Sequence, residues 1–345
     1  MMQSIVNPSV TGFVINTRIP PFFRFECVIL YLPSLFHSPN SQNTTYLPTL
    51  PRLFHNLNSQ TPFPPPPPPL KQFYKPPKMS HHVLLLGGHG KVAQLLTPLL
   101  LKRSWTVTSV IRAQEQVPTI KKLGESQNGK LNVLVRSLED VKSTDDAKKV
   151  IEDAGREGEK GVDYVVWSAG AGGKGGPERT YAIDRDAAIH FIRAAASTPS
   201  ITKFLMVSYL ASRKAKPAWW SEEEWKAAQH VNNEVLPTYY KAKIAADEEL
   251  YRVSRESETL VGINLRPGTL TLEPAGKVEL GRTKGSGGDV SRETVAVVAD
   301  ELLAREGVRN GWIDLLDGAE GVREAVERVV REGVDAAEGD PVYDE

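Results

Sequence analysis

The chain has little cysteine, no excess of either charge, and no long apolar run. Cys27 is the single cysteine among 345 residues, so no disulfide can form within the chain. That usage is typical of a reducing compartment, and we expect a cytoplasmic protein. The 42 basic and 42 acidic side chains balance, which argues against a nucleic-acid surface. The run 27–36 (CVILYLPSLF) contains a proline and is far shorter than the roughly 20 residues of a membrane span, so no membrane partner is predicted.

Residues 1–78 differ in composition from the rest of the chain. They are rich in proline, serine, threonine and asparagine, contain one acid, Glu26, and end in PFPPPPPPLKQFYKPPK. Proline removes backbone donors and favours extended polyproline II, so we predict a disordered extension. Three interpretations stay open: a transit segment, which would make the protein mitochondrial; a ligand for an SH3 or WW domain; or a tail upstream of a true start at Met79.

From Met79 to Glu345, apolar runs alternate with amphipathic stretches. This alternation predicts a single α/β domain with a doubly wound parallel sheet, the Rossmann fold. The expected strands are 82–86, 106–111, 131–136, 163–168, 203–208, 260–266 and 312–316. The expected helices are 91–103, 144–155, 184–197, 241–254, 292–305 and 321–331.

Two long connections, 209–238 and 268–289, interrupt the alternation. Each follows the carboxyl end of an expected strand, where ligands bind in open α/β sheets, so we expect substrate loops there. The first connection contains Trp219, Trp220 and Trp225. These rings either cover a small apolar cluster or line the substrate site.

The stretch LLLGGHGKVAQLL places three glycines after the first expected strand and before the first expected helix. Such spacing is typical of a dinucleotide-binding turn, because one glycine permits the turn and another lets a pyrophosphate approach the backbone. A small third residue, Ala93, lets the helix pack close to the strand. Free N–H groups at the helix N-terminus favour the phosphates. The predicted cofactor-binding residues of this turn are Gly87, Gly88, Gly90, Lys91, Val92 and Ala93.

The second expected strand, in WTVTSVIRAQ, distinguishes between the two nicotinamide dinucleotides. An NAD site usually has an acid at the end of this strand to bind the ribose hydroxyls. No acid lies between Trp105 and Gln114, and Arg112 stands at the strand end. A guanidinium can bind a 2′-phosphate through paired hydrogen bonds, so NADP is favoured over NAD.

Tyr239 and Lys243 lie four residues apart at the start of the helix that follows the first long connection. They therefore share one helical face. A nearby ammonium would lower the pKa of a phenol and make it a usable acid–base group. Tyr74 and Lys78 have the same spacing inside the proline tract, so the evidence comes from the placement of the pair, not from the spacing alone.

The order of these motifs resembles a known family. GGHGKVA, VVWSAGAGG, FLMVSYL, YYKAK and NLRPGTL follow one another as in the atypical short-chain dehydrogenase/reductases, in the group of NmrA-like proteins and flavin/biliverdin reductases. The resemblance covers about residues 83–330. It implies that Ala169, Gly170 and Pro267 lie along the cofactor, that Tyr239 is the acid–base group, and that Lys243 is its partner and a ribose contact.

One position departs from the family pattern. The family often has Ser–Ser or Ser–Thr after the fifth strand, with the second member binding the substrate oxygen, whereas this chain has Ser208–Tyr209. Ser208 takes that role, or Ser212 does, or the role is lost.

These observations predict an enzyme, an NADP-dependent oxidoreductase that moves a hydride between the cofactor and a carbonyl or alcohol. Tyr239, Lys243 and Ser208 are the predicted catalytic residues, the substrate is a small molecule, and no metal is predicted. Two other functions stay open, an epimerase and an NmrA-like dinucleotide sensor without catalysis.

A variant that begins at Met79 should retain the melting temperature and NADPH affinity of the full chain, because the proline-rich segment precedes a complete α/β pattern. Calorimetry and NADPH titration of the two proteins test this expectation. A clear loss in either quantity would show that residues 1–78 pack on the domain.

Overall fold

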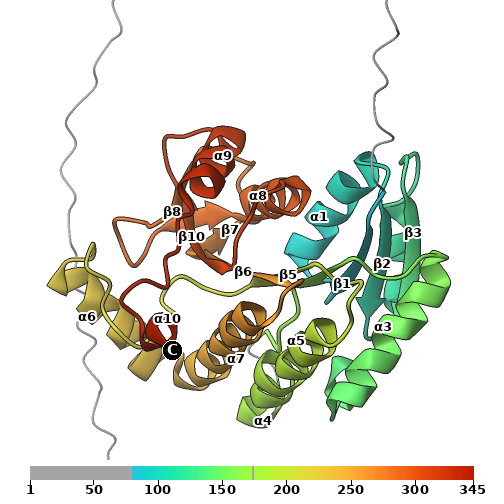
Figure 1. Cartoon of the computed structure of the whole chain (residues 1–345), viewed down its shortest axis with the longest axis horizontal. Coiled ribbons are helices and arrows are strands. Elements are labelled where there is room, and N and C mark those ends of the chain that lie inside the picture. Colours follow the sequence, from blue (N-terminus) through green and yellow to red (C-terminus); the bar gives the residue numbers. More distant parts are fainter. Residues whose placement is uncertain (1–79, 173–174) are drawn as a thin grey trace, which may run out of the picture. The chain divides into compact units, whose positions relative to one another are not determined.

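Within residues 80–172 and 175–345, which the computed structural model describes, eight strands form one sheet in the order β3-β2-β1-β4-β5-β6-β10-β8 (Figure 1). Neighbours from β3 to β10 run parallel, and β8 joins β10 antiparallel at the edge. The extension predicted over residues 1–78, with its proline tract, lies outside the described residues. The strands are β1 (His82–Leu86), β2 (Thr106–Ile111), β3 (Lys130–Val135), β4 (Tyr164–Trp167), β5 (Lys203–Val207), β6 (Val261–Pro267), β8 (Val278–Gly281) and β10 (Gly311–Asp317).

The strand order reverses at β1. The chain builds β1, β2 and β3 outward in one direction and then returns to place β4 on the other side of β1. The doubly wound Rossmann fold expected from the sequence is confirmed, with β8 as an antiparallel addition. Ligands of such sheets bind beyond the carboxyl ends of the strands at this reversal.

Helices cover both faces of the sheet (Figure 1). Helices α1 (Lys91–Lys102), α8 (Arg292–Ala304) and α9 (Val322–Glu332) lie on one face. Helices α3 (Thr144–Gly158), α5 (Ala188–Ala196) and α7 (Pro237–Glu256) lie on the other. Because both faces are buried, the central strands are mostly apolar, as in the fully buried β1.

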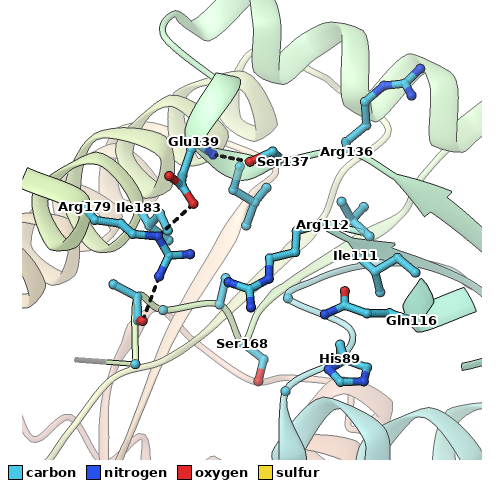
Figure 2. Close-up of a pocket in the computed structure, with 18 of the residues that line it drawn as sticks. His89, Ile111, Arg112, Gln116, Arg136, Ser137, Glu139, Ser168, Arg179 and Ile183 are labelled. Atoms are coloured by element: carbon cyan, nitrogen blue, oxygen red, sulfur yellow. Dashed lines mark hydrogen bonds and ion pairs between the residues drawn. The ribbon is translucent and has the colours of Figure 1, made fainter. Parts of the chain in front are cut away.

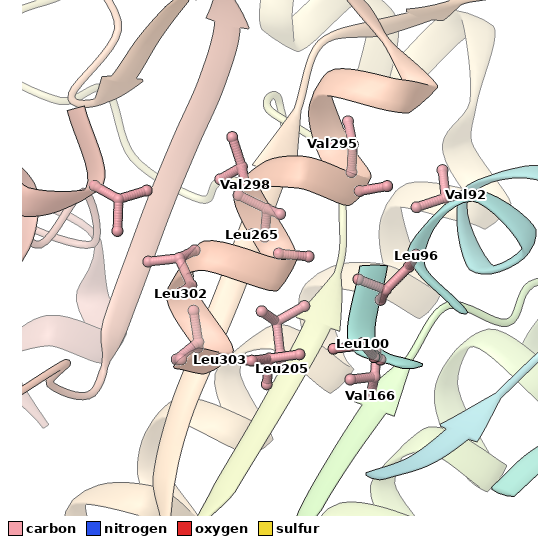
Figure 3. Close-up of a cluster of buried hydrophobic side chains, with 14 of the residues drawn as sticks. Val92, Leu96, Leu100, Val166, Leu205, Leu265, Val295, Val298, Leu302 and Leu303 are labelled. Atoms are coloured by element: carbon pink, nitrogen blue, oxygen red, sulfur yellow. The ribbon is translucent and has the colours of Figure 1, made fainter. Parts of the chain in front are cut away.

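The first of these layers is held by apolar packing and by one ion pair. Leu96 and Leu100 of α1 and Leu302 of α8 pack over Leu205 and Leu265 of the strands (Figure 3). At the end of α1, the guanidinium of Arg103 donates two hydrogen bonds of 2.7 Å to the carboxylate of Asp300 on α8. This bidentate pair fixes the relative position of the two helices.

Serine residues are the N-caps of several helices. Ser143 accepts a hydrogen bond from the N–H of Asp146 at the start of α3, and Ser291 accepts one from Thr294 at the start of α8. Each satisfies one of the N–H groups that a helix start leaves unpaired. The N-terminus of α1 differs, because its cap is Gly90 and has no side chain to offer.

Both connections predicted as loops contain secondary structure. The first holds α6 (Glu222–His230) and a π-helical segment, η4 (Val231–Val235); the second holds β8 and a small parallel pair, β7 (Thr269–Thr271) and β9 (Asp289–Ser291). The helix predicted over 184–197 starts earlier, as α4 (Gly176–Thr180) and a second π-helical segment, η3 (Tyr181–Ala187). The remaining short helices are α2 (Val117–Lys122) and α10 (Pro341–Asp344), with 3₁₀ turns η1 (Gln114–Gln116) and η2 (Leu138–Asp140).

Trp220 joins these two connections. Its indole N–H donates to the carbonyl of Thr283 at 2.9 Å, and its ring packs with Leu210 and Leu316 in a small apolar cluster. Glu224 adds a second link by accepting hydrogen bonds from the N–H and hydroxyl of Ser286. Of the two roles considered for the tryptophans, Trp220 has the structural one, because only 2% of it is exposed.

No helix in the described part of the chain has both the length and the apolar character that crossing a bilayer requires.

The turn from β1 to α1 allows no side chain at Gly87. Its φ is +81°, and a Cβ there would lie 2.6 Å from the backbone of Ala169 at the end of β4. Gly87→Ala should therefore lower the free energy of unfolding through both the left-handed backbone and the collision. Gly307→Ala is the matched control, because its φ is +76° but a Cβ would meet nothing closer than 3.8 Å.

Denaturant unfolding of the two variants measures both effects. Gly307→Ala should cost about 1–2 kcal/mol, the penalty for a left-handed alanine, and Gly87→Ala clearly more. Equal losses would show that the approach of β4 to this turn is not a constraint.

Candidate dinucleotide site

A cleft of about 470 Å³ lies at the reversal of strand order, beyond the ends of β1, β2, β3 and β4 (Figure 2). Many of the predicted cofactor residues meet in it. Its lining includes Gly87, Gly90, Lys91, Arg112, Ala169 and Gly170.

The glycine turn shapes one wall of this cleft. Gly90 is the N-cap of α1 and has no side chain to bond the first helical N–H groups, so these are free for an anion. The predicted residues Gly88, Val92 and Ala93 lie behind the turn and do not appear in the lining of the cleft. Gly88 donates its N–H to the carbonyl of Val110 at 2.9 Å, and Val92 and Ala93 are buried in the core.

Arg112 is an exposed arginine at the end of β2, and it lines the cleft. Among the described residues, it forms no ion pair or hydrogen bond. The two other arginines that line the cleft are engaged, Arg136 with Asp153 at 3.3 Å and Arg179 with Glu139 at 2.8 Å. Figure 2 shows the Arg136 side chain directed away from Arg112. Arg112 thus has a guanidinium free for an added anionic group.

Other cleft residues were not identified from the sequence. Gln116 follows β2, and its buried Oε1 has no hydrogen-bond partner among the described residues. A buried acceptor without a partner is costly, which indicates a ligand donor at this point. The signal that could have found these residues is their place just after the carboxyl ends of β2, β3 and β4. They are Gln116, Arg136, Ser137, Leu138, Glu139 and Arg179.

Tyr239 and Lys243 form a second group, on the first turns of α7. Lys243 is 1% exposed, and its ammonium donates to the carbonyl of Val207, at the end of β5, at 3.1 Å. Tyr239 is partly buried, and its ring lies 5.1 Å from that of Tyr209. The hydroxyl of Tyr239 forms no hydrogen bond with another described residue.

Asp184, another residue that sequence reasoning missed, connects this second group to the cleft. It is 1% exposed, lies on the π-helical segment η3, and accepts a hydrogen bond from the N–H of Ala171 at 2.9 Å. Ala171 lines the cleft, and the charge of Asp184 acts on both Lys243 and Tyr239. π-Helical segments often occur at functional sites.

The pKa of the Tyr239 phenol moves opposite to the expected direction. Burial raises this pKa, and the negative charges of Asp184 and Asp247 raise it further. The expectation that Lys243 would lower the pKa is wrong for this arrangement, because the ammonium donates to the Val207 carbonyl and its charge acts on Asp184 and Asp247.

Ser208 and Ser212, the two candidates for binding a substrate oxygen, share one partner. Ser208 donates to Oδ2 of Asp247 at 2.6 Å, and Ser212 donates to the same oxygen at 2.7 Å. Tyr209, which replaces the second serine of the family pattern, donates its hydroxyl to Asn232 at 2.7 Å. All three hydroxyl protons therefore already have acceptors in the protein.

Pro267 ends β6 and is buried. Its carbonyl accepts a hydrogen bond from the N–H of Leu210 at 2.9 Å. This bond joins β6 to the segment that follows β5, beside Ser208 and Tyr209.

The residues of the cleft fit a nicotinamide dinucleotide. Gly87 and Gly90 line the cleft with bare backbone, and the start of α1 offers N–H donors to a pyrophosphate. Arg112 and Gln116 supply a free cation and an unpartnered acceptor on the side of β2.

Comparison with known proteins agrees with this geometry. Residues 87–306 match the model of a family described as NAD(P)H-binding. The UPF0659 protein C216.03 of Schizosaccharomyces pombe is 33% identical over 203 residues, which are 58% of this chain and 75% of that protein. The "Uncharacterized sugar epimerase YhfK" of Bacillus subtilis is 28% identical over 246 residues, 71% of this chain and 98% of that protein.

Among solved structures, a Bacillus halodurans protein provisionally named an NAD-dependent epimerase/dehydratase is 26% identical, with a TM-score of 0.56 over 72% of this chain and 100% of that one. The predicted resemblance is confirmed, and the chain belongs to the NAD(P)H-binding family.

Proposed function

We propose that this protein is an NADP(H)-dependent oxidoreductase that interconverts a carbonyl and an alcohol. The observation that carries the proposal is the place of the Tyr239 hydroxyl. It forms no hydrogen bond within the described residues, and it is linked through the charge of Asp184 to the loop that lines the dinucleotide cleft.

The preference for NADP rests on Arg112. Its guanidinium lies in the cleft without a partner in the described part of the chain, and no acid lies between Trp105 and Gln114 to receive ribose hydroxyls. Planar guanidinium groups bind phosphate oxygens through paired, charge-assisted hydrogen bonds. Arg112 would thus bind a 2′-phosphate, while the start of α1 binds the pyrophosphate.

Tyr239 suits the reducing direction of the reaction. Because its pKa is raised, the phenol is protonated at neutral pH and can give a proton to the alkoxide that forms when a carbonyl accepts a hydride. A bound nicotinamide supplies that hydride. Lys243, fixed by the Val207 carbonyl, holds positive charge near the oxygen that Tyr239 protonates.

Two other functions have support. The names of the Bacillus relatives favour an epimerase, which would oxidise and re-reduce one carbon with the same groups. The engagement of Ser208, Ser212 and Tyr209 within the protein favours an NmrA-like sensor that binds the dinucleotide without turnover.

Arg112→Asp should weaken NADPH binding by roughly tenfold or more and leave NADH binding similar or better, because a charge-assisted contact contributes about 1.5–3 kcal/mol. Titration of both cofactors by fluorescence or calorimetry measures the two dissociation constants. Arg136→Gln is the control, because that guanidinium is already paired with Asp153 and points away from Arg112. If Arg112→Asp leaves NADPH affinity unchanged, Arg112 does not select the cofactor.

Tyr239→Phe should reduce turnover of a carbonyl panel by about 10²–10⁴-fold, the usual contribution of an acid–base group, with NADPH affinity near normal. The ring and its packing stay, and only the proposed proton donor is removed. Consumption of NADPH measured at 340 nm gives the rate.

Tyr240→Phe is the matched control, since that side chain points about 100° around the helix. Its hydroxyl donates to the carbonyl of Arg213 at 2.9 Å, so its loss removes a structural contact only. Equal effects of the two substitutions would refute the role of Tyr239. Tight NADPH binding without turnover of any carbonyl or epimerisation of any sugar would favour the sensor.

A further inference from the structure

Asp247 is a fully buried carboxyl at which three segments of the chain meet. Its Oδ2 accepts the hydroxyls of Ser208 and Ser212, which follow β5, at 2.6 and 2.7 Å. Its backbone carbonyl accepts a hydrogen bond of 3.0 Å from the side chain of Asn264 on β6. Asp247 itself lies on α7, one turn after Lys243.

The charges around Asp247 come from several elements. Lys243 on α7 and Arg266 on β6 face it with positive charge, and the phenols of Tyr209 and Tyr239 respond to its negative charge. Burial raises the pKa of Asp247, while the two cations and the two serine hydroxyls oppose that rise.

The serine hydroxyls keep their direction in either protonation state of Asp247. Because Oδ2 already accepts two hydrogen bonds, a proton taken up by the carboxyl would belong on Oδ1, which has no partner among the described residues. A hydroxyl has a single proton, so Ser208 can offer a ligand only the lone pairs of its oxygen.

We propose that Asp247 is a positioning residue that accepts hydrogen bonds from the hydroxyls of both Ser208 and Ser212. Because its hydroxyl proton is engaged in this way, Ser208 cannot donate to the substrate oxygen. The proton for that oxygen then comes from Tyr239 alone among these hydroxyls. The ligand group nearest to Ser208 is one that donates, a hydroxyl or an N–H. The hydrogen-bond network does not depend on the proposed oxidoreductase function, but this catalytic consequence rests on it.

Ser208→Ala and Ser212→Ala form a matched pair for the catalytic consequence, because each removes one hydroxyl from the same oxygen. We expect their turnover numbers on a carbonyl that the wild type reduces to agree within about tenfold. A donor to the developing oxyanion contributes about 10²–10³-fold, so a Ser208→Ala rate more than tenfold below that of Ser212→Ala would overturn the proposal.

The melting temperature tests the network without any substrate. Each serine substitution should lower it by about 2–6 °C, because each removes a hydrogen bond to a buried carboxyl. In an Asp247→Leu background, which has no acceptor, Ser208→Ala and Ser212→Ala should have no effect or raise it. In an Asp247→Asn background, where an amide oxygen still accepts, the losses should return.

Losses that persist in the Asp247→Leu background would overturn the network. If Asp247→Leu does not fold, the two serine variants are compared in the wild-type background. Unequal decreases in their melting temperatures would then overturn the network. If the wild type turns over no carbonyl while the melting pattern is as expected, the proposed oxidoreductase function fails and Asp247 remains the group that orients Ser208.

Discussion

The ammonium of Lys243 is buried, and much of the candidate site follows from how the chain accommodates that charge. An isolated ammonium in a protein interior is costly unless opposite charge and hydrogen-bond acceptors surround it. Lys243 has the carbonyl of Val207 and the charges of two buried carboxylates, Asp184 and Asp247. These two carboxylates belong to segments 63 residues apart in the sequence, so the charge of one lysine acts on two separate elements, η3 and α7.

Each of these two carboxylates holds a different segment of the candidate site in place. Asp184 accepts the N–H of Ala171 and so sets the loop after β4, which lines the dinucleotide cleft. Asp247 accepts two serine hydroxyls and so sets the segment after β5. Burial raises the pKa of the Tyr239 phenol, and the negative charges of both carboxylates raise it further despite the nearby ammonium. A site arranged in this way favours a neutral tyrosine that gives a proton.

The sequence predicted the parts of the fold that depend on local pattern. The strands from β1 to β6 and the glycine turn are recognisable because apolar runs and glycine spacing lie within a few residues of one another. The antiparallel β8 was missed, because four residues in a glycine-rich connection carry no clear period. The pairing of Ser208 with Asp247 was missed as well, since it joins residues 39 positions apart and depends on how α7 packs beneath β5. A carboxylate four residues after Lys243 on the buried face of a helix was the available signal.

Arg112 and Lys243, the two cations proposed for cofactor binding and for the acid–base group, lie in opposite electrostatic environments. Arg112 is exposed and unpaired among the described residues, so its full charge is available to a ligand, and changing it leaves the buried network untouched. Lys243 is buried and balanced, so removing it would strand two buried carboxylates and damage folding together with function. Asp184 links the two regions, because its carboxylate accepts a hydrogen bond from the cleft loop and its charge acts on Tyr239. A shift of the loop at Ala171 would therefore change both the hydrogen bond to Asp184 and the electrostatic field at the Tyr239 phenol.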